Sequence, residues 1–561
     1  MIRRFGGYDF NKSIEDNRFH NAQNVCADNY PAISTRVPHA TIHTLTNPHG
    51  MIAHSKLAWV DGTQLFFDGI AVSGLTLSDA DKTMINIGAR IVIFPDKVYY
   101  NTHDGTYGSL ENIVTTEGTV SAELCMFDGT SYNNPPISPA APTDPVDGDY
   151  WIDSSSDPHV LKLFSSSADA WVTVETVYVK ISCPGIGAGF SEYDGITISG
   201  MANAALNGDF LLYGAAADHI IVAAIIDQTF SQTTPATFSR TCPDMDFVTE
   251  SKNRLWGCSS AKHEIYACAQ GDPTNWHQFM GLSTDSYAAT IGTPGDFTGA
   301  VTHRGYVTFF KEDYIHKLYG SRPANYSLEE TESRGVQPGS ASSIVIVNET
   351  LLYKSSDGVC ALAAALPSSI SDAFGNATYT DAVAGAAQGK YYISMIDASG
   401  EYRLFHYDTE HGEWYRDDDM QVRWFAEHDN ELYYITADNV LHSMFGGTYK
   451  AGIPVVAETP VEWVLETGHI GMSYPDYKWC SKLLLRMELG ASSSVAVAVK
   501  YNDSDVWEQS VTLSTTGMRS FQAPIMPRRC DTLKLRIMGI GHCDLYSITK
   551  TIEQGSESTV W

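Results

Sequence analysis

The stretch between Tyr306 and Gly320 reads YVTFFKEDYIHKLYG, two apolar and aromatic runs joined by a charged corner. Strand-forming runs separated by a polar turn are typical of an antiparallel hairpin. Successive residues of a strand point to opposite faces of its sheet, and both faces of the first run are largely apolar. We therefore expect other sheets to pack on both sides of this hairpin, with the KED triplet turning in solvent.

The same pattern returns along the chain at a nearly constant spacing. Further copies are IVIFPDKVYYNT from Ile91, LLYKSSDGVCAL from Leu351, KYYISM from Lys390 and ELYYIT from Glu431. Counted from Tyr306 to Leu351, Tyr391 and Leu432, the steps are 45, 40 and 41 residues. A period of about 40–50 residues with four strands per unit is typical of propeller blades, which bury both faces only when they form a ring. The alternative is a set of unrelated hairpins in β-sandwiches.

We predict an all-β chain that forms a β-propeller of about six blades, with five or seven also allowed. An N-terminal strand around residues 32–44 is expected to pair with the last blade, because ring closure removes an exposed sheet edge. Such a closure would bring residues near the start of the chain against residues near 440.

Two changes in residue composition and pattern divide the chain further. A Pro-, Ser- and Asp-rich segment from Asn133 to Pro158 leads into short strands split by Gly and Asn turns, which predicts a small β domain inserted in a blade loop. After Gly447, apolar and polar residues alternate with period two, as in a half-buried antiparallel sheet. The predicted organisation is 1–114 for an N-terminal arm and the first blades, 115–240 for the insertion, 241–457 for the remaining blades and 458–561 for a C-terminal β-sandwich and tail.

The charge and the cysteines limit the partners of the chain. Its 36 Lys and Arg against 66 Asp and Glu give a net charge of −30, which argues against sequence-specific binding of nucleic acid. This charge favours self-repulsion between crowded copies, or a surface to which passing DNA does not adhere. The ten cysteines contain no CxxC pair, so we expect buried thiols; a Cys258–Cys268 bridge across a hairpin is the alternative.

Targeting signals are absent from the sequence. The first 25 residues contain no apolar core of a secretory signal, and no run approaches the ~18 apolar residues of a membrane span. We expect synthesis in a cytoplasm and no membrane insertion.

The sequence lacks the common catalytic motifs, and we therefore predict that the chain is not an enzyme and holds no cofactor or metal. Neither GxSxG nor HExxH occurs. The nearest phosphate-loop candidates, GAAQGKYY from Gly385 and GIGAGF from Gly185, have the wrong spacing and no following helix, and are interpreted as turns. No carboxylate pair stands out as the acid and nucleophile of a propeller glycosidase or lyase, the enzymatic alternative.

Two acidic segments and three aromatic residues are the candidates for a binding site. Asp147, Asp149 and Asp153 could surround calcium, but Val146 occupies a ligand position of the EF-hand pattern, so we interpret this loop as solvated. The segment RDDDM from Arg416 receives the same interpretation. The aromatic residues of the insertion are candidate glycan contacts, because exposed rings can stack on the apolar faces of sugars; the alternative is that they form a small core. These residues are Tyr150, Trp151 and Trp171.

Several longer phrases resemble one protein family. They are NRLWGCSSAKHEIYACAQGDPTNWHQF from Asn253, GDFTGAVTHRGYVTFFKEDYIHKLYGSRP from Gly295, RGVQPGSASSIVIVNETLLYKSSDGV from Arg334, GKYYISM from Gly389, CADNYPAISTRVPH from Cys26 and RRCDTLKLRIMGIGHCDLYSI from Arg528. These phrases are similar to propeller-type structural proteins of tailed bacteriophages. The resemblance covers most of the chain and is weakest over 115–240. It consists of similar strand and turn phrases and includes no catalytic motif.

The resemblance implies a non-enzymatic part of the virion, located in the tail as a hub, tip or head-to-tail connector. Such a protein acts by assembly with other virion proteins and is expected to form a ring of identical copies. The alternative is a receptor- or glycan-binding tail protein that uses the inserted β domain for attachment to a host surface glycan.

Overall fold

The computed structural model describes residues 1–363, 365–447, 455–458, 460–472, 477–502, 504–526 and 528–554. These residues form strands almost throughout, and the helical residues lie in short 3-10 turns. The turns are η1 (Ala204–Leu206), η2 (Pro323–Asn325), η3 (Ala341–Ser343) and η4 (Asp372–Phe374). The all-β class predicted from the alternating apolar runs is confirmed.

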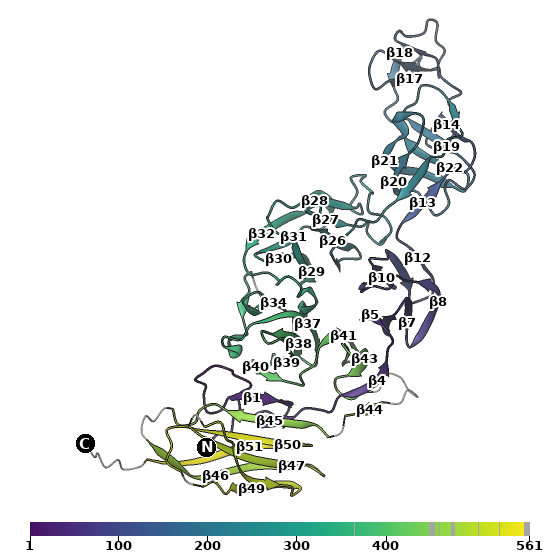
Figure 1. Ribbon diagram of the computed structural model, residues 1–561. Helices are drawn as coiled ribbons and strands as arrows, with labels where there is room; N and C mark the ends of the chain where they lie inside the picture. Colours follow the sequence, from purple (N-terminus) through teal and green to yellow (C-terminus); the bar gives the residue numbers. More distant parts are fainter. Residues whose placement is uncertain are drawn as a thin grey trace.

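Seven blades of four antiparallel strands form a ring (Figure 1). Five of them are separate sheets, whereas the sixth continues through β1 (Phe19–Gln23) into the sandwich and the seventh also pairs with β44 (Val456–Ala457). The first two blades are β5 (Pro48–Ala53), β6 (Leu57–Asp61), β7 (Gln64–Phe67) and β8 (Ile70–Thr76), then β9 (Thr83–Ile87), β10 (Arg90–Phe94), β11 (Val98–Asn101) and β12 (Tyr107–Ser109). The third and fourth are β25 (Phe247–Glu250), β26 (Leu255–Ser259), β27 (Glu264–Ala267) and β28 (Tyr287–Thr290), then β29 (Phe297–His303), β30 (Tyr306–Lys311), β31 (Tyr314–Tyr319) and β32 (Ser327–Glu332). The fifth and sixth are β33 (Val345–Val347), β34 (Thr350–Ser355), β35 (Gly358–Leu362) and β36 (Ser368–Ser369), then β37 (Tyr379–Ala387), β38 (Lys390–Asp397), β39 (Tyr402–Asp408) and β40 (Glu413–Arg416). The seventh contains β41 (Val422–His428), β42 (Glu431–Thr436) and β43 (Val440–Ser443), completed by β4 (Ala40–Thr44).

The ring is closed by the N-terminal strand. β4 pairs antiparallel with β43, and β41 of the seventh blade contacts β5 of the first. The predicted closure by an early strand is thereby confirmed, and the ring is a propeller of seven blades, one more than the favoured count. Only residues 40–44 of the predicted 32–44 take part in the pairing.

The hairpin between Tyr306 and Gly320 forms β30 and β31, the two middle strands of the fourth blade. Residues 307–311 are all buried, because neighbouring blades cover both faces of the sheet. Lys311 was expected in solvent but is only 1% exposed. Its ammonium donates to the carbonyl of Thr293 and lies 5.0 Å from the ring centroid of Phe297, so only the acidic part of the KED corner reaches water.

The segment between the second and third blades forms a separate β-module. Its strands are β13 (Asn112–Thr115), β14 (Val120–Cys125), β15 (Ile137–Ser138), β16 (Tyr150–Asp153), β17 (Val160–Ser165), β18 (Ala170–Thr173), β19 (Tyr178–Ser182), β20 (Gly195–Ser199), β21 (Gly208–Ala216), β22 (His219–Ala223), β23 (Phe230–Gln232) and β24 (Thr237–Arg240). β15–β18 form a small sheet at the far tip, and the others form an eight-stranded sheet nearer the propeller (Figure 1). The module projects from one end of the molecule.

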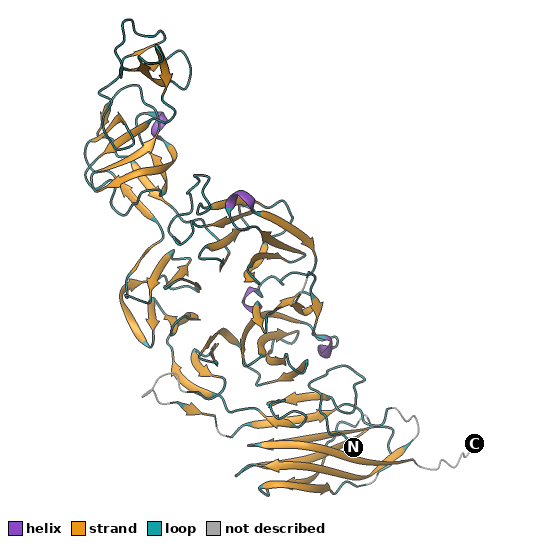
Figure 2. Cartoon of the chain, turned by 180° about the vertical axis from the view of Figure 1, so that it is seen from behind, coloured by secondary structure: helices purple, strands orange, loops and turns teal. Residues whose placement is uncertain are grey.

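Two further sheets stand at the opposite end (Figure 2). Their strands are β1 (Phe19–Gln23), β2 (Val25–Cys26), β3 (Ile33–Thr35), β45 (Glu462–Thr467), β46 (Lys478–Leu489), β47 (Ser494–Tyr501), β48 (Glu508–Leu513), β49 (Gly517–Ala523), β50 (Leu533–Ile540) and β51 (Cys543–Gln554). One sheet has the order β1-β45-β50-β47-β48 and the other β2-β3-β51-β46-β49. The short β44 (Val456–Ala457) pairs with β4 beside the seventh blade.

The N-terminal arm, which consists of the residues before β4 (1–39), connects the sandwich to the propeller. β1 pairs antiparallel with β45, and its last residue, Gln23, pairs parallel with Arg416 of β40 in the sixth blade. One apolar core continues from that blade, through Phe19 of the arm, to Leu485 and Ile537 of the sandwich. Sandwich, arm and sixth blade therefore pack as one body.

Candidate functional site

The aromatic residues of the insertion lie in the small tip sheet. Trp151 is only 4% exposed; its indole donates to the carbonyl of Ser138, and its ring packs edge-to-face on Trp171 at 5.4 Å. Tyr150 packs edge-to-face on Tyr132 at 4.6 Å, and both Tyr150 and Trp171 are half-buried. Trp151 thus serves the core of the tip, which limits the predicted glycan contact to Tyr150 and Trp171.

The acidic loop of the insertion does not gather its carboxylates around one point. Asp147 accepts from the backbone of Ser166, Asp149 accepts from the backbone of Val146, and Asp153 pairs with Lys162. Each carboxylate therefore stabilises its own turn or strand. In the part of the chain that the structure describes, the carboxylates of Asp147, Asp149 and Asp153 form no three-ligand cluster.

The ten cysteines are all buried and unpaired, including Cys258 and Cys268, so the alternative of a bridge between these two is not found.

The segment RDDDM was interpreted as a solvated loop; this is wrong for Asp417, which is buried, and for Asp418, which is half-buried, whereas Asp419 is exposed. Asp417 is 1% exposed, and both its oxygens lie 3.2 Å from Nδ1 of His406. Asp418 accepts from Arg36, and Asp419 accepts from the guanidinium of Arg416. Each of the three aspartates thus has its own buried or half-buried cation or imidazole, because the segment links β40 and β41 directly beneath the N-terminal arm.

Arg36 joins the arm, the propeller and the segment that leads into the sandwich. Its Nε donates to Asn24 at 2.9 Å, and Nη1 and Nη2 reach the two oxygens of Glu458 at 2.8 and 3.1 Å. Nη2 also donates to Asp418 at 2.5 Å. A planar guanidinium suits such bidentate contacts, and Arg36 itself is only 7% exposed. We call this set of residues the Arg36 clamp.

A histidine beside the clamp completes the one group of potential metal ligands found among the described residues. His39, Asp418 and Glu458 each offer a ligand atom, all within 4.8 Å of one another. The Arg36 guanidinium already occupies both carboxylates. Burial, reinforced by the charge of Arg36, lowers the pKa of His39 to about 3, so its ring is neutral and accepts or donates a hydrogen bond with Tyr434 at 2.9 Å. The group is therefore an ion-pair network, and we assign it no metal.

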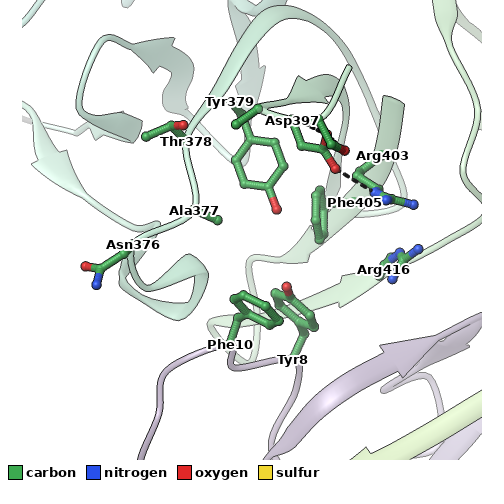
Figure 3. Close-up of a pocket in the computed structure, with 12 residues that line it drawn as sticks. Tyr8, Phe10, Asn376, Ala377, Thr378, Tyr379, Asp397, Arg403, Phe405 and Arg416 are labelled. Carbon is green, nitrogen blue, oxygen red and sulfur yellow. Dashed lines mark hydrogen bonds and ion pairs between the residues drawn. The ribbon is translucent and has the colours of Figure 1, made fainter. Parts of the chain in front are cut away.

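The pocket with the clearest binding chemistry lies between the N-terminal arm and the sixth blade (Figure 3). We call it the arm pocket. Its volume is about 380 Å³, within the range of small-ligand sites. The arm contributes Tyr8 and Phe10. The blade with its preceding loop contributes Asn376, Ala377, Thr378, Tyr379, Asp397, Ala398, Ser399, Arg403, Phe405 and Arg416.

Aromatic rings form one side of the arm pocket. Tyr8 packs on Phe10 at 6.2 Å and on Phe405 at 5.5 Å, and Tyr379 packs on Phe405 at 5.6 Å. The hydroxyl groups of Tyr8 and Tyr379 point into the space between the rings (Figure 3). Burial raises the pKa of both phenols, so both are protonated near neutral pH. Phe10 stands at the mouth of the arm pocket and is 45% exposed.

Charged groups form the other side. Asp397 accepts from Ser399 and from Nε of Arg403 at 3.1 Å, and the hydrogen bond from the Ser399 side chain is the main cause that lowers its pKa to about 2. Asp419 accepts from Nη1 of Arg403 and from Nε and Nη2 of Arg416. Among the described residues, Nη2 of Arg403 and Nη1 of Arg416 have no acceptor. The arm pocket therefore combines ring faces with spare N–H donors, which suits binding, whereas ionised Asp397 is no proton donor.

Comparisons with known proteins add only the fold. Neither a protein family nor a curated protein sequence matches the chain. Among solved structures, the chain is similar to the exo-β-1,3-galactanase of Phanerochaete chrysosporium, with 11% identity, 52% of this chain and 93% of that chain covered, and a TM-score of 0.19. It is also similar to Raptor of Chaetomium thermophilum (10%, 72% and 29% covered, TM-score 0.28) and to an engineered GH43 glycoside hydrolase (9%, 55% and 98% covered, TM-score 0.21). None of the three is a phage tail protein.

These comparisons correct the prediction that the chain is not an enzyme. Chains of similar fold include glycoside hydrolases, so missing motifs do not exclude catalysis. The physical reason is that glycoside hydrolysis needs two carboxylates at a set separation, and a fold can supply them from strands far apart in sequence.

The helical turns of the described residues are each far too short to cross a bilayer.

Proposed function

We propose that this chain is a structural component of a tailed-bacteriophage virion, located in the tail and acting by assembly with other virion proteins. The sequence phrases quoted above supply the family, and the architecture supplies a mechanical reason. The observation that carries the proposal is the interlock of the two ends of the chain: β1–β3 belong to the sandwich, whereas β4 closes the propeller.

This interlock suits a part that transmits force. Two connections run between propeller and sandwich, residues 36–39 and a second one that includes residues 455–458. They are held side by side by backbone and side-chain bonds between His39 and Glu458. The Arg36 clamp adds ionic contacts at the same place. Because the connections are tied to each other and to the sixth blade, the propeller cannot swing relative to the sandwich without breaking them.

The arrangement along the molecule also fits assembly. The sandwich and the inserted module stand at opposite ends (Figures 1 and 2). Several large apolar side chains are exposed near the sandwich, among them Met472, Val506, Met518 and Met526. Exposed apolar side chains of this kind are candidates for contact with a neighbouring protein. We propose that the sandwich end meets other virion proteins, and that copies of the chain form a ring.

Mass spectrometry of purified phage particles, combined with antibody-labelled electron microscopy, tests the proposal. We expect this chain in a fixed ratio to the other tail proteins, with label at one place on the tail. Its absence from washed particles, while it is abundant in the infected cell, would refute a virion role.

Attachment to a host glycan through the insertion is the second candidate. It is favoured by the position of the β15–β18 sheet at the end remote from the sandwich, where a tail protein would meet a surface (Figure 1). Replacing both half-buried rings (Tyr150→Ala with Trp171→Ala) is expected to reduce cell binding by isolated protein at least tenfold. Unchanged binding by the correctly folded double variant would reject this site.

A further inference from the structure

We propose that the arm pocket binds an acidic sugar, a hexose ring that carries a carboxylate. The inference goes beyond the proposed function, because it concerns a site at the arm and sixth blade that neither assembly at the sandwich end nor attachment through the tip of the insertion would use. It rests on the charge, the rings and the dimensions of the arm pocket.

The arginines define the charge of the ligand. In a chain of net charge −30, Arg403 and Arg416 both line one pocket, against the single lining carboxylate of Asp397. Asp419 anchors both guanidinium groups from outside the lining, and each keeps one terminal nitrogen without an acceptor among the described residues. Guanidinium groups held in place in this way bind a carboxylate with little loss of side-chain freedom. The free donors therefore favour an anionic ligand over a neutral one.

The aromatic side chains define its shape. Phe10 is 45% exposed although it is a large apolar ring, and it packs against Tyr8 with ring planes only 8° apart. The C–H face of a sugar ring is apolar and would cover the surface that Phe10 leaves in water, as burial of apolar area is favourable. The protonated hydroxyls of Tyr8 and Tyr379 point into the space between the rings, where hydroxyl groups of a sugar need partners (Figure 3).

A neighbouring cavity gives room for a second sugar unit. It has a volume of about 260 Å³ and shares the segment Asn376–Tyr379 with the arm pocket, so the two lie side by side. Lys354 borders this second cavity, but its ammonium is buried and donates to Gln337 at 3.0 Å and to the carbonyl of Ser355. The added room beside the arginines of the arm pocket fits a short acidic oligosaccharide better than a lone inorganic anion.

Calorimetric titration of the full chain with three probes tests the inference. The probes are a trisaccharide of glucuronic acid, the glucose trisaccharide of the same linkage, and inorganic phosphate. We expect the acidic trisaccharide to bind at least tenfold more tightly than either of the others. Equal binding of the two trisaccharides would overturn the role of the arginines, and equal binding of phosphate would overturn recognition of the ring. No binding of the acidic trisaccharide would overturn the inference as a whole.

Matched variants place the binding in the arm pocket. Arg416→Gln and Phe10→Ala are each expected to weaken binding of the acidic trisaccharide about tenfold or more, since a hydrogen bond to a charged group is lost in the first and a ring contact in the second. Arg416→Gln leaves Asp419 paired with Arg403, so the fold is kept.

Two control variants make the same chemical changes elsewhere. Arg528 is also paired with one carboxylate, that of Glu508, and Phe279 is 59% exposed. Arg528→Gln and Phe279→Ala are expected to bind like the unmodified chain, as is Trp171→Ala in the insertion. Binding lost equally in the controls, or lost only with Trp171→Ala, would refute the arm pocket as the site and leave the virion proposal untouched.

Discussion

Arg36 is the residue on which the junction of propeller and sandwich depends most. Replacing it by methionine keeps the length of the side chain but leaves Asn24, Asp418 and Glu458 without their shared donor. Breaking a buried ion pair costs about 3–5 kcal/mol, and less where the partners reach water. Asp418 and Glu458 keep 32% and 34% of their side-chain exposure, so we expect local opening to become easier by about 2–3 kcal/mol.

Amide hydrogen exchange of residues 36–44 and 455–458 measures this change directly. Arg528→Met is the control, because its pair with Glu508 is exposed on both sides and such pairs contribute less than about 1 kcal/mol. If Arg36→Met left the exchange of both segments unchanged, the clamp would not hold the junction.

His39 makes the same junction sensitive to acid. Its pKa is about 3 in the folded chain against an ordinary value of 6.5, so below pH 6.5 the unfolded chain takes up a proton that the folded chain does not. Stability from this residue is thus complete above pH 6.5 and is lost as the pH falls toward 3. We expect the free energy of unfolding to fall between pH 7 and pH 5 by about 2 kcal/mol more in the unmodified chain than in His39→Gln.

Denaturant unfolding at the two pH values provides the measurement. His103→Gln, at an exposed position, is the control and should retain the full fall. A fall of the same size in His39→Gln would show that His39 does not carry this acid sensitivity.

At the level of residues, the sequence revealed composition but not pairing. RDDDM reads as a solvated acidic run because its partners, Arg36, His406 and Arg403, are distant or stand in other strands. The arm pocket was missed for the same reason: Tyr8 and Phe10 meet the sixth blade only after the arm has folded back. Tyr150, Trp151 and Trp171 were found because they cluster in the sequence, but only their packing shows that Trp151 is buried and the other two are half-buried.

Among the elements, the attachment of the insertion depends on a glycine. Gly195 begins β20, and its amide donates to Asn275 of the third blade at 3.3 Å. A methyl group at this position would meet the carbonyl oxygen of His277 at 2.2 Å, so the two backbones must separate. We expect Gly195→Ala to weaken this contact by about 1–3 kcal/mol, as overpacking of a close contact does.

Hydrogen exchange of residues 193–199 and 275–277 reports on this contact. Gly292→Ala is the matched control, because a methyl group there meets nothing within 4 Å. Exchange in Gly195→Ala that stays as slow as in the control would mean that the insertion is held in some other way.

The elements were predicted best where strand and partner are close in sequence. Hairpins such as β30–β31 and β42–β43 reveal themselves through two apolar runs and a turn, so the blades could be recognised. β1 was missed, and β3 was assigned to the last blade, because these short strands pair with β45 and β51, more than 400 residues away. The blade count was lower by one because the long insertion between β12 and β25 separates the second blade from the third and hides the blade boundaries.

For the whole molecule, the central claim is that propeller, arm and sandwich act as one rigid part of a phage tail. The long-range pairings of the arm support rigidity, since they join residues from both ends of the chain in shared sheets. The net charge of −30 favours repulsion between copies in solution, so we expect assembly to need specific contacts.

Cryo-electron microscopy of purified particles tests this claim most directly. The account predicts that propeller and sandwich fit the tail density together, in the relative orientation of Figure 1 and at one fixed position, with the sandwich end against neighbouring proteins. Tail density that has no place for the chain, or that accepts propeller and sandwich only in a different mutual orientation, would contradict it.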